Sequence, residues 1–141
     1  MAINILCLIA GCIGEEIGWR GFLLPALNRN LSLIVSSVVV GVFWGIWHLN
    51  FEDGIIGFAV YALFTTTLSI IISWVQTKSG GSIIPAIAFH FFVNLFARVI
   101  LNGRIGITAF LVLSAMFGAF GVILFFADKK TFLSKSEFAK I

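Results

Sequence analysis

Two adjacent carboxylates lie inside an apolar stretch near the start of the chain. Glu15 and Glu16 are followed, four residues after the second, by Arg20. Residues four apart on a helix share a face, whereas adjacent residues point about 100° apart. The spacing therefore predicts an ion pair between Glu16 and Arg20 that supports the structure. It leaves Glu15 without a partner on its own helix, and such a carboxylate is a candidate general base.

Imidazole and amide groups occur in two later apolar stretches. His48 has Trp44 one helical turn before it, and His90 is followed four residues later by Asn94. Glu15 and His48 could orient a water molecule. His90 and Asn94 could donate hydrogen bonds to an oxyanion, or bind a metal or water. This inventory suits the attack of water on a carbonyl group with stabilisation of the tetrahedral intermediate.

The composition indicates a membrane protein. The chain has 141 residues, of which 60% are hydrophobic and 11% charged, and its mean hydropathy is +1.13. Soluble domains carry about 25% charged residues, so a soluble domain is excluded. The net charge of +3 comes mainly from residues outside the apolar stretches. It therefore informs membrane topology and does not indicate nucleic-acid binding.

Polar turns divide the chain into five apolar stretches, each near the length that crosses a bilayer. We expect an all-α, polytopic membrane helix bundle of about five transmembrane helices. Residues 1–128 would form the core domain, and residues 129–141 a basic tail. His48 lies near one end of its stretch, while Glu15 and His90 lie near the middle of theirs. The expected helices are Ile3–Leu27, Leu31–Leu49, Ile55–Val75, Ile83–Leu101 and Ile105–Ala127.

The distribution of basic residues predicts an orientation. With five spans, Glu52 and Asp53 fall on one side and Arg104 is the main positive exception there. Loops rich in Lys and Arg face the cytoplasm, so the opposite side and the C-terminal tail should be cytoplasmic, in a bacterial plasma membrane. The basic residues on that side are Arg29, Lys78, Lys129, Lys130, Lys135 and Lys140.

Three motifs in this order resemble those of the type II CAAX prenyl proteases and lysostaphin-resistance-like proteins, the bacteriocin-processing family. Residues 15–20, EEIGWR, match its EExxxR motif, and residues 90–94, HFFVN, match its HxxxN motif. Residues 44–48, WGIWH, are similar to its FxxxH motif, with Trp44 in place of phenylalanine. The similarity covers about residues 11–101.

The resemblance implies an intramembrane endopeptidase with a helical fold, whose substrate is a membrane-associated peptide of the CAAX, bacteriocin or signal-peptide type. Carried over by motif, Glu15 and His48 would activate water, and His90 and Asn94 would form the oxyanion site. Glu16 and Arg20 would support the architecture. No cofactor is certain; a divalent metal such as zinc, if present, would be held by Glu15, His48 and His90.

Several alternatives stay open. A non-catalytic membrane protein of the same fold could confer bacteriocin immunity or serve as a scaffold. A proton- or ion-coupled transporter could use Glu15 and Glu16, although inverted repeats, which would support it, are not found. Members of the family usually carry helices before the glutamate-bearing one, so we expect either a longer protein or a minimal variant.

Overall fold

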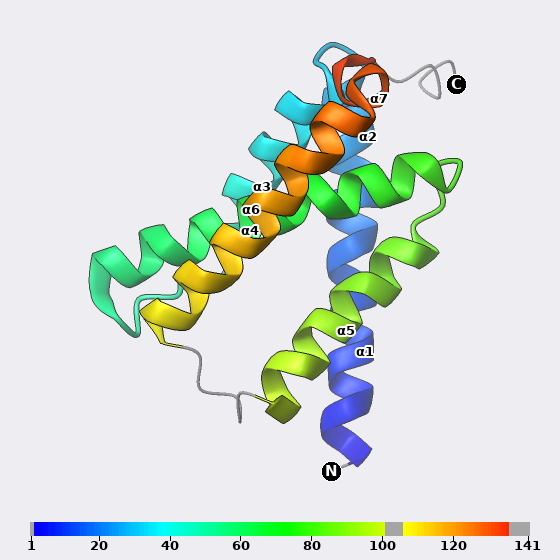
Figure 1. Cartoon of the computed structure of the whole chain (residues 1–141). Coiled ribbons are helices and arrows are strands. Elements are labelled where there is room, and N and C mark those ends of the chain that lie inside the picture. The colour runs from blue at the N-terminus through cyan, green and yellow to red at the C-terminus, as the bar shows by residue number, and fades with distance from the viewer. Residues whose placement is uncertain (1, 101–105, 136–141) are drawn as a thin grey trace.

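The computed structural model describes residues 2–100 and 106–135, and every regular element within them is a helix (Figure 1). The prediction of an all-α fold is confirmed. The helices follow the predicted stretches closely; the largest difference is at Val75, because the helix predicted to end there continues to Lys78. The predicted ends at 101 and 105 lie outside the described residues. The elements are α1 (Ala2–Glu16), the π-helical segment η1 (Ile17–Leu23), α2 (Leu24–Asn28), α3 (Leu33–Trp47), α4 (Gly54–Lys78), α5 (Ile84–Ile100), α6 (Ile107–Ala127) and α7 (Lys129–Leu133).

The first three elements form one continuous helix whose middle is wound more widely than its ends. In η1 the Leu24 N–H donates to the carbonyl of Trp19, five residues earlier. The next donor in this pattern would be residue 25, but Pro25 has no N–H. The carbonyl of Arg20 instead accepts a hydrogen bond from Nε2 of Gln76 on α4, at 2.9 Å. A side chain of α4 thus replaces a backbone donor that the first helix lacks.

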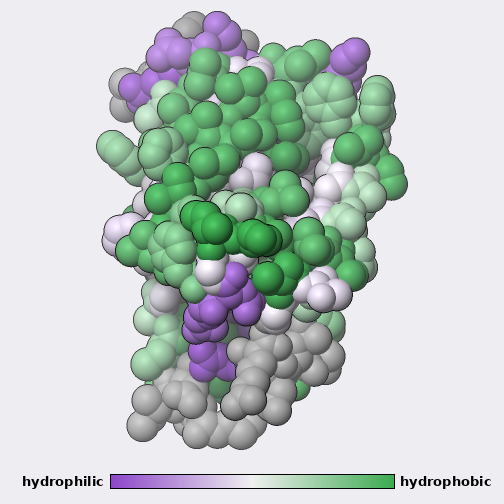
Figure 2. Space-filling view, turned by 90° about the vertical axis from the view of Figure 1, so that its left-hand side faces the viewer, coloured by the Kyte–Doolittle hydropathy of each residue, from purple (hydrophilic) through white to green (hydrophobic). Residues whose placement is uncertain are grey.

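Among the described residues, two helices are long and apolar enough to cross a membrane, α4 with 25 residues and α6 with 21. The apolar helices α3 and α5 are shorter, with 15 and 17 residues. The prediction of about five spans therefore stays a prediction. Large apolar side chains cover much of the outside: Phe22 is 75% exposed and Phe126 is 73% exposed. Figure 2 shows a hydrophobic belt on one face, with hydrophilic residues gathered at the top and in one lower patch.

The closest helix contact is between α3 and α4. A Cβ atom added at Gly41 would lie 2.5 Å from an α4 Cα atom, and one at Gly45 would lie 2.6 Å from another. Small residues spaced in this way let two helix backbones approach. The approach brings hydroxyls onto carbonyls across the interface: Thr65 Oγ1 donates to Gly41 O at 3.0 Å, and Ser69 Oγ donates to Ser37 O at 2.8 Å. The interface therefore fixes the position of α3.

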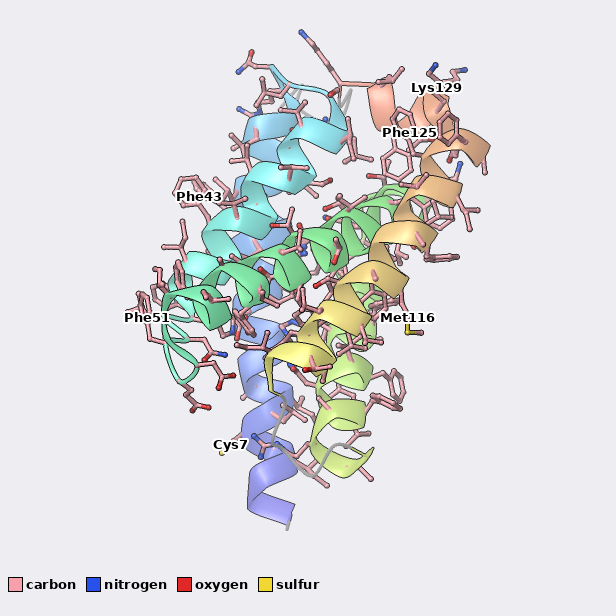
Figure 3. All side chains as sticks on the ribbon, turned by 60° about the vertical axis from the view of Figure 1, so that its left-hand side comes forward. Cys7, Phe43, Phe51, Met116, Phe125 and Lys129 are labelled. Atoms are coloured by element: carbon pink, nitrogen blue, oxygen red, sulfur yellow. The ribbon has the colours of Figure 1, made fainter. Side chains whose placement is uncertain are left out.

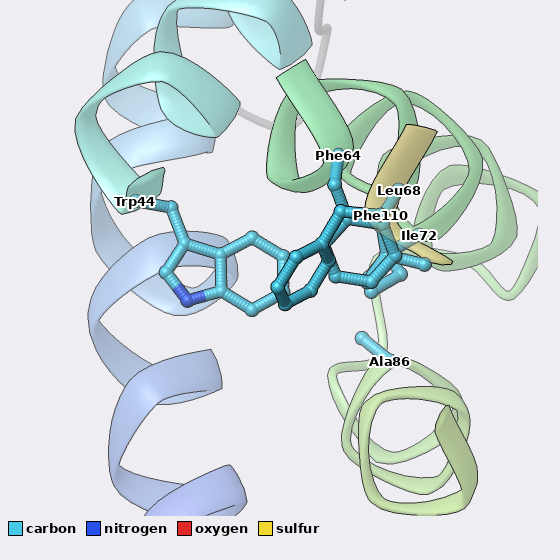
Figure 4. Close-up of a cluster of buried hydrophobic side chains, with 6 residues drawn as sticks. All are labelled: Trp44, Phe64, Leu68, Ile72, Ala86 and Phe110. Carbon is cyan, nitrogen blue, oxygen red and sulfur yellow. The ribbon is translucent and has the colours of Figure 1, made fainter. Parts of the chain in front are cut away.

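Apolar side chains from α3, α4, α5 and α6 meet in one buried cluster (Figure 4). Trp44 is the member contributed by α3, and its indole is 2% exposed. Half of the cluster comes from α4, which lies between α3 and α6 and packs against both (Figure 1). The cluster consists of Trp44, Phe64, Leu68, Ile72, Ala86 and Phe110.

A polar contact joins the end of α6 to α4. Asp128 Oδ2 accepts hydrogen bonds from Trp74 Nε1 and from Lys78 Nζ, both at 3.0 Å. Hydrogen bonding from Trp74, followed by that from Lys78, lowers the pKa of Asp128 to about 2. Because the folded-state pKa is depressed, the contact stabilises the fold at neutral pH, and this stability is lost as the pH falls from about 4 towards 2.

The segment that follows, predicted to be a basic tail, begins with the short helix α7. Phe132 is fully buried and packs against Phe125 with a centroid distance of 5.7 Å. Asn28 Nδ2 donates to the carbonyl of Ser134 at 3.3 Å, which ties the end of α2 to the residues after α7. Lys129 lies near Phe125 at this end of the molecule (Figure 3). Residues 136–141 of the predicted tail, like Arg104, lie outside the described part of the chain.

The glycine contact generates a first prediction. Gly41→Ala should lower the free energy of unfolding by about 1–3 kcal/mol, because overpacking at a backbone atom forces the helices apart. The measurement is the thermal midpoint of helical circular dichroism in detergent. Gly121→Ala is the matched control, because its added Cβ would meet only Ile70 Cγ2 at 3.7 Å. Equal midpoints for the two variants would contradict the close contact.

A second prediction concerns the donor from α4. Gln76→Leu leaves the Arg20 carbonyl buried without a donor, so unfolding should become easier by about 1–3 kcal/mol. The same thermal measurement applies. Thr77→Val serves as control because the Thr77 hydroxyl bonds only the carbonyl of Ser73 on its own helix. A Gln76→Leu protein as stable as the control would refute the proposed replacement.

Candidate functional site

The two adjacent glutamates point to different partners. Glu16 Oε1 accepts hydrogen bonds from Arg20 Nη1 at 3.0 Å and from His90 Nδ1 at 2.9 Å. Glu16 and Arg20 have no exposed surface, and His90 is 3% exposed. The predicted pair within the first helix is therefore present, and it extends to α5 through an imidazole. This buried triad ties the first helix to α5.

Glu15 lies on the other side of the helix and remains partly accessible. Its Oε2 accepts a hydrogen bond from Trp44 Nε1 at 2.7 Å and lies 3.9 Å from His48 Nε2. The side chains of Glu15 and His48 are 28% and 30% exposed. The structure thus brings together the two residues that the sequence predicts to activate water, although they come from helices far apart in the chain.

The hydrogen bonds of His48 determine what its second nitrogen offers. His48 Nδ1 lies 2.8 Å from the carbonyl of Trp44. A carbonyl only accepts, so Nδ1 carries a proton, and in the neutral ring Nε2 presents a lone pair. Two acceptors, Nε2 and the Glu15 carboxylate, therefore face each other at a separation that a water molecule can bridge by donating to both. α3 ends at Trp47, so His48 lies just beyond the end of this helix and from there faces Glu15.

Trp44 contacts polar members of the site from three different helical segments. Its Nε1 bonds Glu15, its ring lies 4.6 Å from the Arg20 guanidinium carbon, and its centroid is 4.9 Å from that of His90 in an edge-on arrangement. A guanidinium at this distance from an indole face is held by a cation–π interaction. The sequence identifies Trp44 only as the aromatic residue of the second motif and assigns it no hydrogen bond. Its position one turn before His48 was the available signal.

Asn94 shares a cavity with Glu15. The cavity has a volume of about 310 Å³. Within it, Asn94 Nδ2 donates to Cys12 Sγ at 3.6 Å, a weak contact that leaves the rest of the amide available. The amide and the candidate base therefore face the same space. The lining residues are Cys7, Leu8, Gly11, Cys12, Glu15, Asn94 and Arg98.

His90 differs from Asn94 in its surroundings. Because its Nδ1 meets a carboxylate, that nitrogen carries a proton. Its Nε2 then donates a hydrogen bond only in the imidazolium form and accepts one only in the neutral form. The two roles that the sequence suggests for His90, donor to an oxyanion and metal ligand, thus require different protonation states.

Whether the site could hold a metal ion depends on how its ligating side chains are grouped. Within residues 2–100 and 106–135, no three His, Cys, Asp or Glu side chains are grouped so that they could hold a metal ion. Glu15 and His48 approach each other to 3.9 Å, but the third predicted ligand, His90, is not grouped with them. Catalytic zinc sites use three protein ligands. The described donor set therefore does not fit such a site.

Comparison with known proteins identifies the family of the chain. The chain is 33% identical over 103 residues to CAAX prenyl protease 2 of Methanococcus maripaludis, an alignment covering 64% of this chain and 38% of that protein. It is 30% identical over 87 residues to lysostaphin resistance protein A of Staphylococcus haemolyticus, covering 61% of this chain and 24% of that protein. The aligned part thus spans about two fifths or less of these relatives. A family model matches residues 1–96, which include all three motifs. The chain belongs to the type II CAAX prenyl endopeptidase Rce1-like family.

Proposed function

We propose that this chain is an intramembrane endopeptidase that hydrolyses a peptide bond of a membrane-associated peptide or protein. The observation that carries the proposal is the placement of Glu15. It is held by the indole N–H of Trp44, faces Nε2 of His48 at 3.9 Å, and opens onto the cavity that Asn94 lines. Glu15 thus faces a second acceptor for water, His48, and shares an accessible cavity with an amide donor, Asn94.

The reaction uses these groups in turn. A water molecule donates hydrogen bonds to Glu15 and to His48 Nε2, which aim its oxygen at the scissile carbonyl. As the C–O bond forms, Glu15 takes the water proton, and the carbonyl oxygen becomes an oxyanion that accepts from Asn94 Nδ2. Collapse of the intermediate breaks the C–N bond, and Glu15 returns the proton to the leaving amine.

His90 completes the oxyanion site in its imidazolium form. Its Nδ1 donates to Glu16, so its Nε2 is free to donate to the oxyanion. Charge balance supports this state: the two carboxylates, Glu15 and Glu16, are then offset by Arg20 and His90. A buried cluster of zero net charge avoids the cost of an uncompensated charge in an apolar environment.

The substrate and the membrane setting follow from the relatives and the surface. One relative is named a CAAX prenyl protease, which supports a CAAX-type peptide, with bacteriocin- or signal-type peptides as the alternative substrates. We place the chain in a bacterial plasma membrane as about five spans with its basic C-terminal segment in the cytoplasm. The exposed apolar side chains support contact with lipid. Arg29, Lys129 and Lys130 at one end support the orientation.

The proposal is tested by removing the base alone. Glu15→Gln keeps a side-chain oxygen for Trp44 but cannot take a proton, so turnover should fall by about 10²-fold or more. Cleavage is followed with quenched fluorescent peptides, prenylated and unprenylated, with the purified chain in detergent. Turnover that survives in Glu15→Gln, or that is absent from the folded wild-type chain with every peptide, would overturn the proposal.

The corresponding substitution at the next residue, Glu16→Gln, should lower the stability of the fold. Glu16→Gln removes the charge that compensates buried Arg20, which should cost about 3–5 kcal/mol. Glu15→Gln, at a partly exposed side chain, should change the thermal midpoint little. The midpoints of the two variants are compared side by side in detergent. A fully stable Glu16→Gln protein would contradict the division of roles between the two glutamates.

A further inference from the structure

A third polar residue extends the stripe that α5 contributes to the site. His90, Asn94 and Arg98 are spaced four apart, so they follow one another along one face of α5. The three residues differ in exposure along the stripe: His90 is buried, Asn94 is half-buried and Arg98 is exposed. The stripe therefore leads from the buried triad outwards, past the candidate oxyanion donor, to a positive charge.

Arg98 lines the same cavity as Glu15 and Asn94. No carboxylate in the described part of the chain lies within 4 Å of its guanidinium, whereas Arg20 is paired with Glu16. Its charge is therefore available to a ligand in the cavity. A planar guanidinium binds a carboxylate through two parallel hydrogen bonds, which gives both affinity and orientation.

We propose that Arg98 binds a carboxylate of the peptide substrate, on the leaving-group side of the scissile bond. This inference rests on the proposed function, because it takes the bond to be cleaved at Glu15 and Asn94. Glu15 is negative, so an anion entering the same cavity is favoured only at the end where Arg98 lies. The bound peptide then runs along α5 with its carboxylate outermost.

The geometry also limits the distance from the cleaved bond to the carboxylate. Four residues of α-helix separate Asn94 from Arg98 and rise about 6 Å. An extended peptide advances about 3.3–3.6 Å per residue, so even with the length of the arginine side chain the carboxylate lies within about four residues of the cleaved bond. A free C-terminus supplies such a group, as does a glutamate side chain in the leaving segment.

The test measures binding, so that it does not depend on turnover. Three dansylated alanine–leucine hexapeptides are titrated against the full chain carrying Glu15→Gln, with fluorescence anisotropy as the readout. One ends in a free carboxylate, one ends in a carboxamide, and one ends in a carboxamide but has a glutamate near its end. We expect at least one carboxylate peptide to bind about tenfold more tightly than the plain carboxamide. Which one does so identifies the source of the carboxylate.

The variant Arg98→Gln should abolish this preference while the carboxamide still binds as before. Arg29→Gln, which removes an exposed charge at the other end of the first helix, should retain the preference. Equal binding of all three peptides to the parent, as expected if Arg98 instead contacts lipid headgroups, would overturn the inference. So would a preference that survives Arg98→Gln. If the folded wild-type chain cleaves no peptide but the carboxylate preference is intact, the proposed function is contradicted and the binding site stands.

Discussion

Glu16 is a carboxylate with no exposed surface in a chain that is 60% hydrophobic, so its charge must be compensated by neighbouring groups. Arg20 and His90 share one of its oxygens, which joins two turns of the first helix to α5. Arg20 in turn rests on the ring of Trp44, which brings α3 to the same point. The arrangement of three helices thus depends on the compensation of one negative charge.

The remaining helices act as a frame for this arrangement. α4 contacts α3 through glycines and hydroxyls, and its far end holds Asp128 after α6 through Trp74 and Lys78. The same helix supplies Gln76 to the widened turn of the first helix. Thus α4, which carries none of the predicted site residues itself, positions helices that do. Of the two adjacent glutamates, Glu15 is the accessible one, because Glu16 is enclosed with Arg20 and His90.

Local periodicity explains what could be predicted from the sequence. The helix ranges, the different directions of Glu15 and Glu16, and the pairing of Glu16 with Arg20 depend only on residues within one or two turns of each other. The bond from His90 to Glu16 joins residues 74 positions apart, and the bond from Trp44 to Glu15 joins residues 29 apart. Such contacts depend on how the helices cross. The sequences of α3 and α5 taken separately do not determine that crossing. The π-helical turn was not predicted, and the donor that satisfies the Arg20 carbonyl there, Gln76, lies 56 positions along the chain.

The widened turn also explains which face of the first helix is buried. Cys12, Glu16, Arg20, Leu24 and Asn28 are all buried, at a regular spacing of four residues. In an uninterrupted α-helix each step of four residues overshoots a full turn by about 40°, so a stripe of this period would wind around the helix and away from its partners. The longer turn between Ile17 and Leu23 reverses part of that winding. The first helix can therefore keep one straight polar and apolar seam along its length, from the cavity of Glu15 to the contact of Asn28 with the chain's C-terminal segment.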